Sequence, residues 1–260
     1  MKIKYSTTNG VTLLISILIF YGSLTAQRNT INTYDVIMIS ASYGFHTPLA
    51  DLSQRFGTNF SVGGGLDYLT EDKNLIFGIK GNNLFGNQVK EDVLASLRDV
   101  NGLILGTIGA GEATVAEVFL RERGFYTGAH VGKLFSTSKK NKRAGIRITL
   151  GMGLLQHKIR IQDETGTADQ LRGDLIKGYD QLTNGLALEQ FIGYQQLNRK
   201  TGVNFFAGFE LTEAITKNRR SINFTTQGID TSNRFDVLIG FRVGWIFSLY
   251  VGERGEDIQY

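Results

Sequence analysis

The chain has 260 residues, with 28 Lys and Arg against 24 Asp and Glu, a formal net charge of +4, and no cysteine. A charge this close to balance is not the basic footprint of a nucleic-acid-binding protein. Without cysteine the chain forms no disulfide and carries no lipid on a cysteine, so an exported form must be held together by a packed core or a membrane.

The first 26 residues have the pattern of a secretory signal peptide. Two lysines precede a largely apolar run over residues 11–24, and Ala26 ends the segment. The run is shorter than the ~20 apolar residues that a spanning helix needs, so we expect cleavage after Ala26 rather than a membrane anchor. Residues 27–250 then form one domain, and residues 251–260 form a C-terminal periplasmic tail.

Eight later segments alternate between apolar residues and small or polar residues, which is the pattern of strands with two different faces. The last of them has eight apolar residues on one face, from Phe235 to Leu249, and Gly240, Arg242 and Gly244 on the other. In chain order, the predicted strands are residues 34–46, 58–69, 74–87, 124–136, 144–158, 186–198, 201–214 and 234–250. No segment after the signal has the pattern of a spanning helix, so a membrane-embedded form of this chain must be a barrel.

The connections between these segments alternate strictly between long and short. The long ones are residues 47–57, 88–123, 159–185 and 215–233, and the short ones are 70–73, 137–143 and 199–200. Transmembrane barrels show this alternation because their short turns lie on the periplasmic side and their long loops outside. We expect Pro48 to lie in the first long connection, because a proline has no N–H for a sheet ladder.

The apolar faces carry aromatic residues near both ends of the strands. Such girdles occur where the wall of a membrane barrel meets the two lipid–water interfaces. The predicted lipid-facing girdle is Tyr43, Phe60, Tyr68, Phe77, Phe85, Phe125, Phe135, Tyr194, Phe205, Phe235, Trp245 and Phe247. A soluble barrel or sandwich, the alternative, explains neither the alternating loops nor the glycine-rich opposite face.

The opposite faces carry glycines and charged residues, which fits the narrow interior of a small barrel. A tight last turn would place Glu189 directly opposite Glu210, and two carboxylates so close need a cation between them, for which Arg242 is the nearest candidate. We expect this polar network to plug the barrel; a gated path for protons or small ions is the alternative. The predicted network of the lumen is Asp67, Lys80, His130, Arg147, Glu189, Glu210, Asp236 and Arg242.

Other segments carry weaker signals. Residues 106–114, GTIGAGEAT, resemble a dinucleotide-binding turn but lack a βαβ context, so we expect a loop turn and no cofactor. Residues 89–102 have apolar positions at helical spacing and predict a short amphipathic helix in the longest outer loop. His46, His130 and His157 have no third ligand at a defined spacing, so no metal site is expected.

The spacing of Ser, His and acidic residues yields no catalytic constellation, so we do not expect an enzyme. A surface enzyme that modifies lipid or peptide is nevertheless kept as an alternative. A channel or transporter for small solutes is the other alternative.

These patterns predict an all-β fold: a closed, antiparallel, eight-stranded up-and-down transmembrane barrel. Over essentially all of the mature chain, they resemble the small outer-membrane β-barrel superfamily, the OmpA/OmpX-like barrels. The signal ending LTAQ and the lack of an attached periplasmic domain are most similar to uncharacterised barrels of Bacteroidota, a group that includes accessory barrels of type IX secretion. The tail after residue 250 departs from the terminal aromatic residue that is usual in such barrels.

The resemblance implies a porin-like protein of the cell envelope in the outer membrane of a Gram-negative bacterium. With a plugged lumen, it would act as a scaffold or interaction protein, with outer-membrane lipid around it. An envelope protein would be its partner, through the outer loops or the tail.

Overall fold

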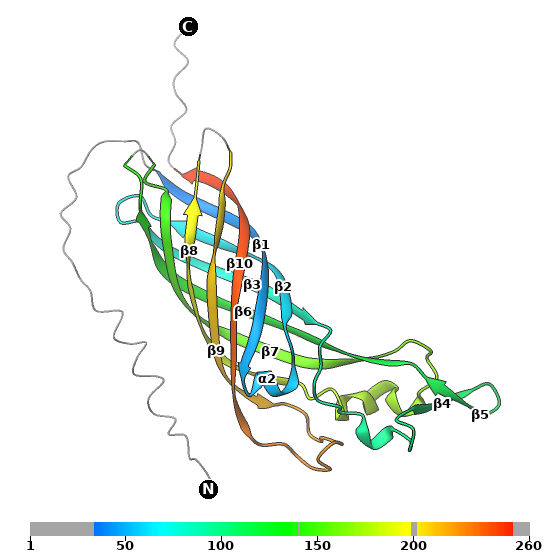
Figure 1. Cartoon of the computed structure of the whole chain (residues 1–260). Helices are drawn as coiled ribbons and strands as arrows, with labels where there is room; N and C mark the ends of the chain where they lie inside the picture. Colours follow the sequence, from blue (N-terminus) through cyan, green and yellow to red (C-terminus); the bar gives the residue numbers. More distant parts are fainter. Residues whose placement is uncertain (1–33, 140, 199–201, 252–260) are drawn as a thin grey trace. The chain divides into compact units, whose positions relative to one another are not determined.

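The computed structural model describes residues 34–139, 141–198 and 202–251. The predicted signal peptide, residues 1–26, and the tail from residue 252 onward lie outside the described residues. In the described part of the chain, eight antiparallel strands close into a barrel in the order β1-β10-β9-β8-β7-β6-β3-β2 (Figure 1). The predicted closed up-and-down barrel is therefore confirmed.

The barrel strands follow one another around the ring, and β10 pairs back onto β1. They are β1 (Asp35–Ala50), β2 (Asn59–Leu69), β3 (Leu75–Gly86), β6 (Val118–Ser136), β7 (Ala144–Asp163), β8 (Thr183–Gln196), β9 (Phe205–Asn218) and β10 (Asn233–Val251). The short connections and the two ends of the barrel, Asp35 and Val251, lie together at one end, here called the turn end. The long connections lie at the other end, here called the loop end.

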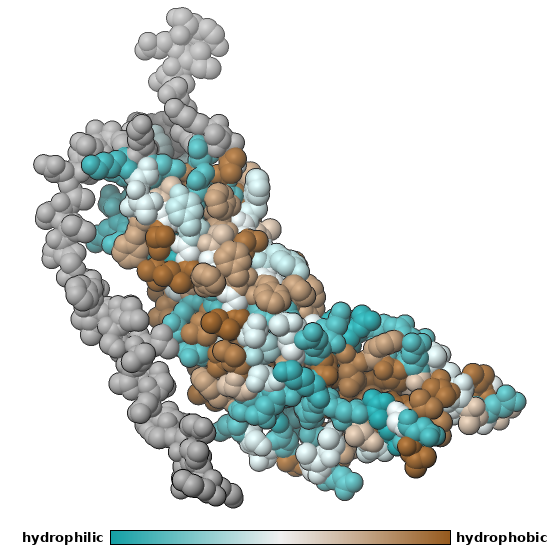
Figure 2. Space-filling view, viewed as in Figure 1, coloured by the Kyte–Doolittle hydropathy of each residue, from teal (hydrophilic) through white to brown (hydrophobic). Residues whose placement is uncertain are grey.

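The outer wall of the barrel is apolar. On β1 and β10, Ile39 lies opposite Phe247 and Tyr43 opposite Val243, and all four side chains are exposed. Every residue of the predicted girdle lies on this wall, exposed or half-exposed. Figure 2 shows apolar side chains over the flank of the barrel and hydrophilic ones around the loops. An exposed apolar surface this extensive is stable in hydrocarbon and not in water, so the barrel spans a membrane.

No helix in the described residues is long and apolar enough to cross a membrane.

Several strands are longer than the sequence predicts. At the loop end, β6 begins at Val118 rather than at residue 124, and β7 continues to Asp163 rather than stopping at residue 158. Pro48, expected in a loop, lies inside β1 opposite Leu238. It is tolerated because the pairing of β1 with β2 ends at His46, so at Pro48 only one edge of β1 is paired.

The predicted amphipathic helix over residues 89–102 is wrong. Only Ala95–Leu97 forms a turn of 3-10 helix there. The Asp99 carboxylate accepts hydrogen bonds from the backbone N–H groups of Asn101 and Leu103, at 2.9 and 2.8 Å. Short acidic side chains that bind nearby N–H groups in this way compete with helix formation.

Further elements lie among the long connections, including 3-10 helices at Asp169–Leu171 and Gly173–Gly178. The helix α2 (Leu52–Arg55) follows β1, and β4 (Ile104–Ile108) pairs with β5 (Glu112–Ala116) as a separate two-stranded sheet. Of the glycine-rich segment 106–114, expected to form a loop turn, only residues 109–111 form the turn of this hairpin, and the residues on either side belong to β4 and β5. Gly109 and Gly111 have φ values of 55° and 104°, which few other residues adopt.

The interior of the barrel is filled in layers. A buried apolar cluster at the turn end, here called the lower cluster, is Val36, Met38, Leu69, Ile76, Leu134, Phe191, Leu197, Phe206 and Ile246. A second cluster at the loop end, here called the upper cluster, joins Leu52, Phe56, Val93 and Leu94 of the connections to strand residues such as Leu84, Leu155 and Leu238. Buried charged side chains from β2, β3, β6, β7, β8, β9 and β10 lie between the two clusters.

Glycines permit the close approach of neighbouring strands in this narrow ring. Gly208 on β9 lies opposite Gly193 on β8, and a Cβ added to Gly208 would meet the carbonyl oxygen of Ile192 at 2.3 Å. Gly81 on the outer face of β3 is different, because the nearest atom to an added Cβ is 4.0 Å away. A side chain larger than hydrogen is therefore excluded at Gly208 and permitted at Gly81.

We predict that Gly208→Val lowers the free energy of unfolding by about 1–3 kcal/mol, because an added side chain must displace the backbone of β8. Gly81→Val is the matched control and is expected to change it by less than ~0.5 kcal/mol. Urea titration of the protein refolded into lipid vesicles measures both. Equal effects of the two variants would show that the close approach of β8 and β9 does not limit packing.

Candidate functional site: the charge network in the barrel interior

Four charged side chains meet in the middle of the interior. Lys80 on β3 forms ion pairs with Glu189 on β8 and Glu210 on β9, and its Nζ lies 3.1 Å from Oε2 of Glu210. Arg242 on β10 has its Nη2 2.9 Å from Glu210 and 3.8 Å from Glu189. All four residues are buried, with at most 8% of their surface exposed. Two cations thus lie between two carboxylates.

A second group of charges adjoins the first. Asp67 on β2 accepts a hydrogen bond of 2.9 Å from Arg147 on β7, and Nε2 of His130 on β6 lies 2.7 Å from its other oxygen. Arg147 also donates to the side-chain oxygen of Gln195 at 3.1 Å. Its guanidinium lies 5.5 Å from the centre of the Phe206 ring, so this group rests on the lower cluster.

The register corrects one detail of the predicted network. Glu189 pairs with Thr212, and Glu210 pairs with Phe191, so the two glutamates are two positions apart rather than directly opposite. The connection between β8 and β9 is longer than the tight turn that a direct pairing required. Lys80 and Arg242 fill the diagonal space that this offset creates.

Asp236 lies inside the barrel but belongs to a different group, near the loop end. One of its oxygens accepts a hydrogen bond of 2.5 Å from the hydroxyl of Thr216 and lies 2.8 Å from Nε2 of His157. His157 is 1% exposed, and the Phe56 ring contacts it edge-on at 5.6 Å. The histidine and the acid are thus both enclosed by the barrel and the loops.

Arg55, which the sequence analysis did not single out, holds the connection after β1 across the barrel mouth. It donates from Nε to Glu91 at 3.2 Å, from Nη1 to Thr183 at 3.1 Å and from Nη2 to the Gln181 carbonyl at 3.2 Å. Burial lowers the pKa of this guanidinium, and the Glu91 carboxylate acts in the opposite direction. Periodicity gives no signal for such a residue, because α2 has only four residues and its partners are far away in the sequence.

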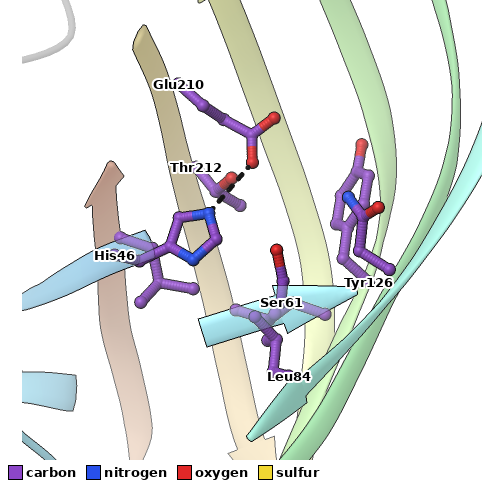
Figure 3. A pocket seen from close by; sticks show the side chains of 9 residues that line it. His46, Ser61, Leu84, Tyr126, Glu210 and Thr212 are labelled. Carbon is purple, nitrogen blue, oxygen red and sulfur yellow. Dashed lines mark hydrogen bonds and ion pairs between the residues drawn. The ribbon is translucent and has the colours of Figure 1, made fainter. Parts of the chain in front are cut away.

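A small cavity lies beside the charge network in the interior. Its volume is about 10 Å³, the size of one water molecule. In Figure 3, His46, Ser61, Tyr126 and Glu210 surround it, and His46 Nε2 lies 3.4 Å from Glu210. A larger cavity of about 470 Å³ opens at the loop end and is lined by Asp51, Gln54, Arg55, Glu91, Asn233 and Arg234.

Within the described part of the chain, no group of three His, Cys, Asp or Glu side chains is arranged to hold a metal ion.

We predict that Lys80→Met lowers the free energy of unfolding by about 3–5 kcal/mol, because it leaves one cation for two buried carboxylates. Adding Glu189→Gln to this variant removes the excess charge and is expected to recover most of the loss. Urea titration in lipid vesicles measures each step.

The control for this series is Arg98→Met in an exposed loop. Arg98 pairs with Asp92 at 2.6 Å, and both side chains are at least one-third exposed, so the change is expected to be below ~1 kcal/mol. If Lys80→Met behaved like this control, the pairs in the lumen would not be holding the barrel together.

No protein-family model matches the chain, and a search of curated proteins finds no match. Among solved structures, the chain is similar to Neisserial surface protein A, with 13% identity, a TM-score of 0.41, and coverage of 81% of this chain and 97% of that chain. It is similar to Ail, the attachment invasion locus protein of Yersinia pestis, with 10% identity, a TM-score of 0.35, and coverage of 83% and 99%. It is also similar to the N-terminal β-barrel domain of Pseudomonas aeruginosa OprF, with 15% identity, a TM-score of 0.35, and coverage of 83% of this chain and 98% of that chain.

A closed ring of antiparallel strands with an apolar wall, aromatic residues at both rims and long connections at one end is the architecture of bacterial outer-membrane barrels. The chain therefore has the fold of a small, eight-stranded outer-membrane β-barrel and lies in the outer membrane of a Gram-negative bacterium.

Proposed function

We propose that this protein is a closed outer-membrane barrel that acts through its surface, as a scaffold or interaction protein of the cell envelope. The observation that carries the proposal is the filled interior. From the turn end inward, a solute would meet the lower cluster, then the paired charges, then the upper cluster beneath α2 and the loops.

A channel is the main competing function. The small cavity beside the network has room for about one water molecule and is not a continuous path. The lower cluster is apolar across the lumen, and Phe191 meets Phe206 there at 5.7 Å between ring centres, edge to face. An ion would have to leave its hydration shell to pass this layer, and the cost of that is prohibitive.

We also infer that the protein is not an enzyme. His157 and Asp236 are the pair most similar to a catalytic dyad, and both are at most 1% exposed beneath the loops. Thr216 shares the Asp236 oxygen with His157 instead of donating to the histidine, so no activated nucleophile results.

The loops offer a surface for a partner. On the β4–β5 hairpin, Ile104 and Ala116 are buried in the upper cluster, while Leu105 and Val115 lie opposite each other and are about half exposed. Apolar side chains held outward by a packed hairpin are typical of protein contact sites. A role as an accessory barrel of type IX secretion is one form of this proposal, and it is supported by the resemblance of the whole chain alone.

We predict that the purified protein in a planar lipid bilayer shows no steady conductance, because the lumen is closed at two levels. A general porin in the same bilayer is the positive control, and heat-modifiable migration on gels confirms that the sample is folded. Stable channels from folded protein would overturn the closed-barrel proposal.

We predict that a photo-reactive amino acid at Leu105 gives a discrete crosslinked product in intact cells, because this side chain faces outward from the hairpin. The same probe at Lys177, an exposed polar loop position, is the matched control and is expected to give none. A Leu105 probe that yields only uncrosslinked barrel would exclude this hairpin as the contact surface.

A further inference from the structure

Four basic residues lie side by side on the outer face of the barrel, where β6 and β7 leave the apolar wall. In the register of these strands, Arg123 is directly opposite Lys158, and Arg121 is directly opposite Arg160. Outward residues alternate with inward ones, so all four share the face that carries Phe125 closer to the membrane centre. This quartet, Arg121, Arg123, Lys158 and Arg160, is called the basic quartet below.

This pairing of basic residues with basic residues destabilises the contact between β6 and β7. Like charges directly opposite each other on one face of a sheet repel. The repulsion of Arg123 by Arg160 and that by Arg121 are each larger than its attraction to the buried Glu122 carboxylate, and its Nη1 donates to the Glu122 carbonyl at 2.6 Å. Glu122 alone does not balance four adjacent cations, which therefore need further anions.

Acidic side chains of this chain only partly meet that need. In the described residues, the one carboxylate within ion-pair distance of the quartet is Asp180, 3.9 Å from Lys158 Nζ. Asp180 is already bonded to Arg220, through Nε at 2.7 Å and through Nη2. Glu164, just past the end of β7 and four residues beyond Arg160, is bonded to Gln162. The quartet thus keeps an excess of positive charge.

The position of the basic quartet along the strands places it at the level of the lipid headgroups. Phe85, a residue of the girdle, lies directly opposite Arg123 and stacks on Phe60 at 6.1 Å between ring centres. A strand rises about 3.3 Å per residue and tilts by roughly 40° in such barrels, so the two pairs of cations lie about 5 and 10 Å beyond Phe125. Lipid headgroups occupy the ~5–8 Å beyond the hydrocarbon.

We propose that the basic quartet is a binding site for the phosphate groups of an anionic lipid in the leaflet at the loop end. Guanidinium groups bind phosphate oxygens through paired N–H donors, and Lys158 adds a point charge. The acyl chains of the same lipid lie against the apolar wall below, on Phe125 and Leu154. The inference rests on the membrane location of the barrel and adds a ligand class to its outer surface.

The experiment measures how many lipid molecules the purified full-length barrel retains in mild detergent, by native mass spectrometry. Three probes are added separately: bisphosphorylated lipid A, the same lipid without its phosphates, and inorganic phosphate. We expect retention of the phosphorylated lipid alone, because the phosphates and the acyl chains are both held. Equal retention of the two lipids would overturn the proposal, and binding of inorganic phosphate alone would show a site for free anions instead.

The test variant replaces all four basic residues with glutamine: Arg121→Gln, Arg123→Gln, Lys158→Gln and Arg160→Gln. We expect its retention of the phosphorylated lipid to fall at least roughly tenfold. The matched control removes the same number of positive charges at the turn end: Lys73→Gln, Lys133→Gln, Lys139→Gln and Lys142→Gln. It is expected to retain the lipid as the parent does, and an equal fall would mean that net charge alone matters.

A second readout separates binding from folding. In vesicles of neutral phosphatidylcholine, the quartet variant is expected to be at least as stable as the parent, because repulsion between its strands is removed. Adding the phosphorylated lipid should then stabilise the parent and not the variant. Conductance stays absent in both, so failure of this inference leaves the closed-barrel proposal standing, and steady channels would overturn that proposal instead.

Discussion

The rest of the structure depends on the narrowness of the ring. A barrel of this strand number encloses a space that side chains alone can fill, and each inward position is therefore a packing position. Gly193 and Gly208 let two strands approach, while Phe191 and Phe206 occupy the room that glycines leave. The same geometry turns every second residue to the lipid, so the apolar wall and the packed lumen are two results of one alternation.

Burying charges in so small a space is tolerable only if they are paired. Glu189, Glu210 and Arg242 come from the neighbouring strands β8, β9 and β10, whereas Lys80 comes from β3 on the other side of the ring, so the contacts of Lys80 join opposite sides of the barrel. Hydrogen bonds between neighbouring strands hold only adjacent positions. The charge network therefore links strands that the ladder does not join, and it fills the middle of the lumen.

The alternating pattern was sufficient to predict the closed barrel, the number of strands and the inward positions of the charged residues, because a period of two specifies a face at every residue. The pattern was insufficient to predict which residues pair across two strands, because that register depends on the length of the connection between them. Glu189 and Glu210 differ from the predicted pairing by two positions, a shift that keeps the face unchanged and so leaves no trace in the pattern.

The misassigned loop elements have local causes. The segment 89–102 has the spacing of a helix, but Asp99 binds the backbone of Asn101 and Leu103 and stops it from forming. The role of Arg55 depends on Thr183 and Gln181, more than 120 residues away, which no short-range pattern can predict. The sequence did not predict the lower cluster. Apolar residues on the inward face, such as Met38 and Ile246, break the alternation of apolar and polar residues, so the pattern does not show which of them pack together.

The pairing of β1 with β10 determines when the barrel can close during assembly. Sixteen residue pairs join β1 to β10, from Asp35 with Val251 to Ala50 with Asp236. The ring has no closed intermediate, because until the final strand arrives both β1 and β9 have an unpaired edge. Closure of the barrel must therefore wait until β10 is available, and a chain cut short within β10 would present two unpaired strand edges to other molecules instead of forming a closed barrel.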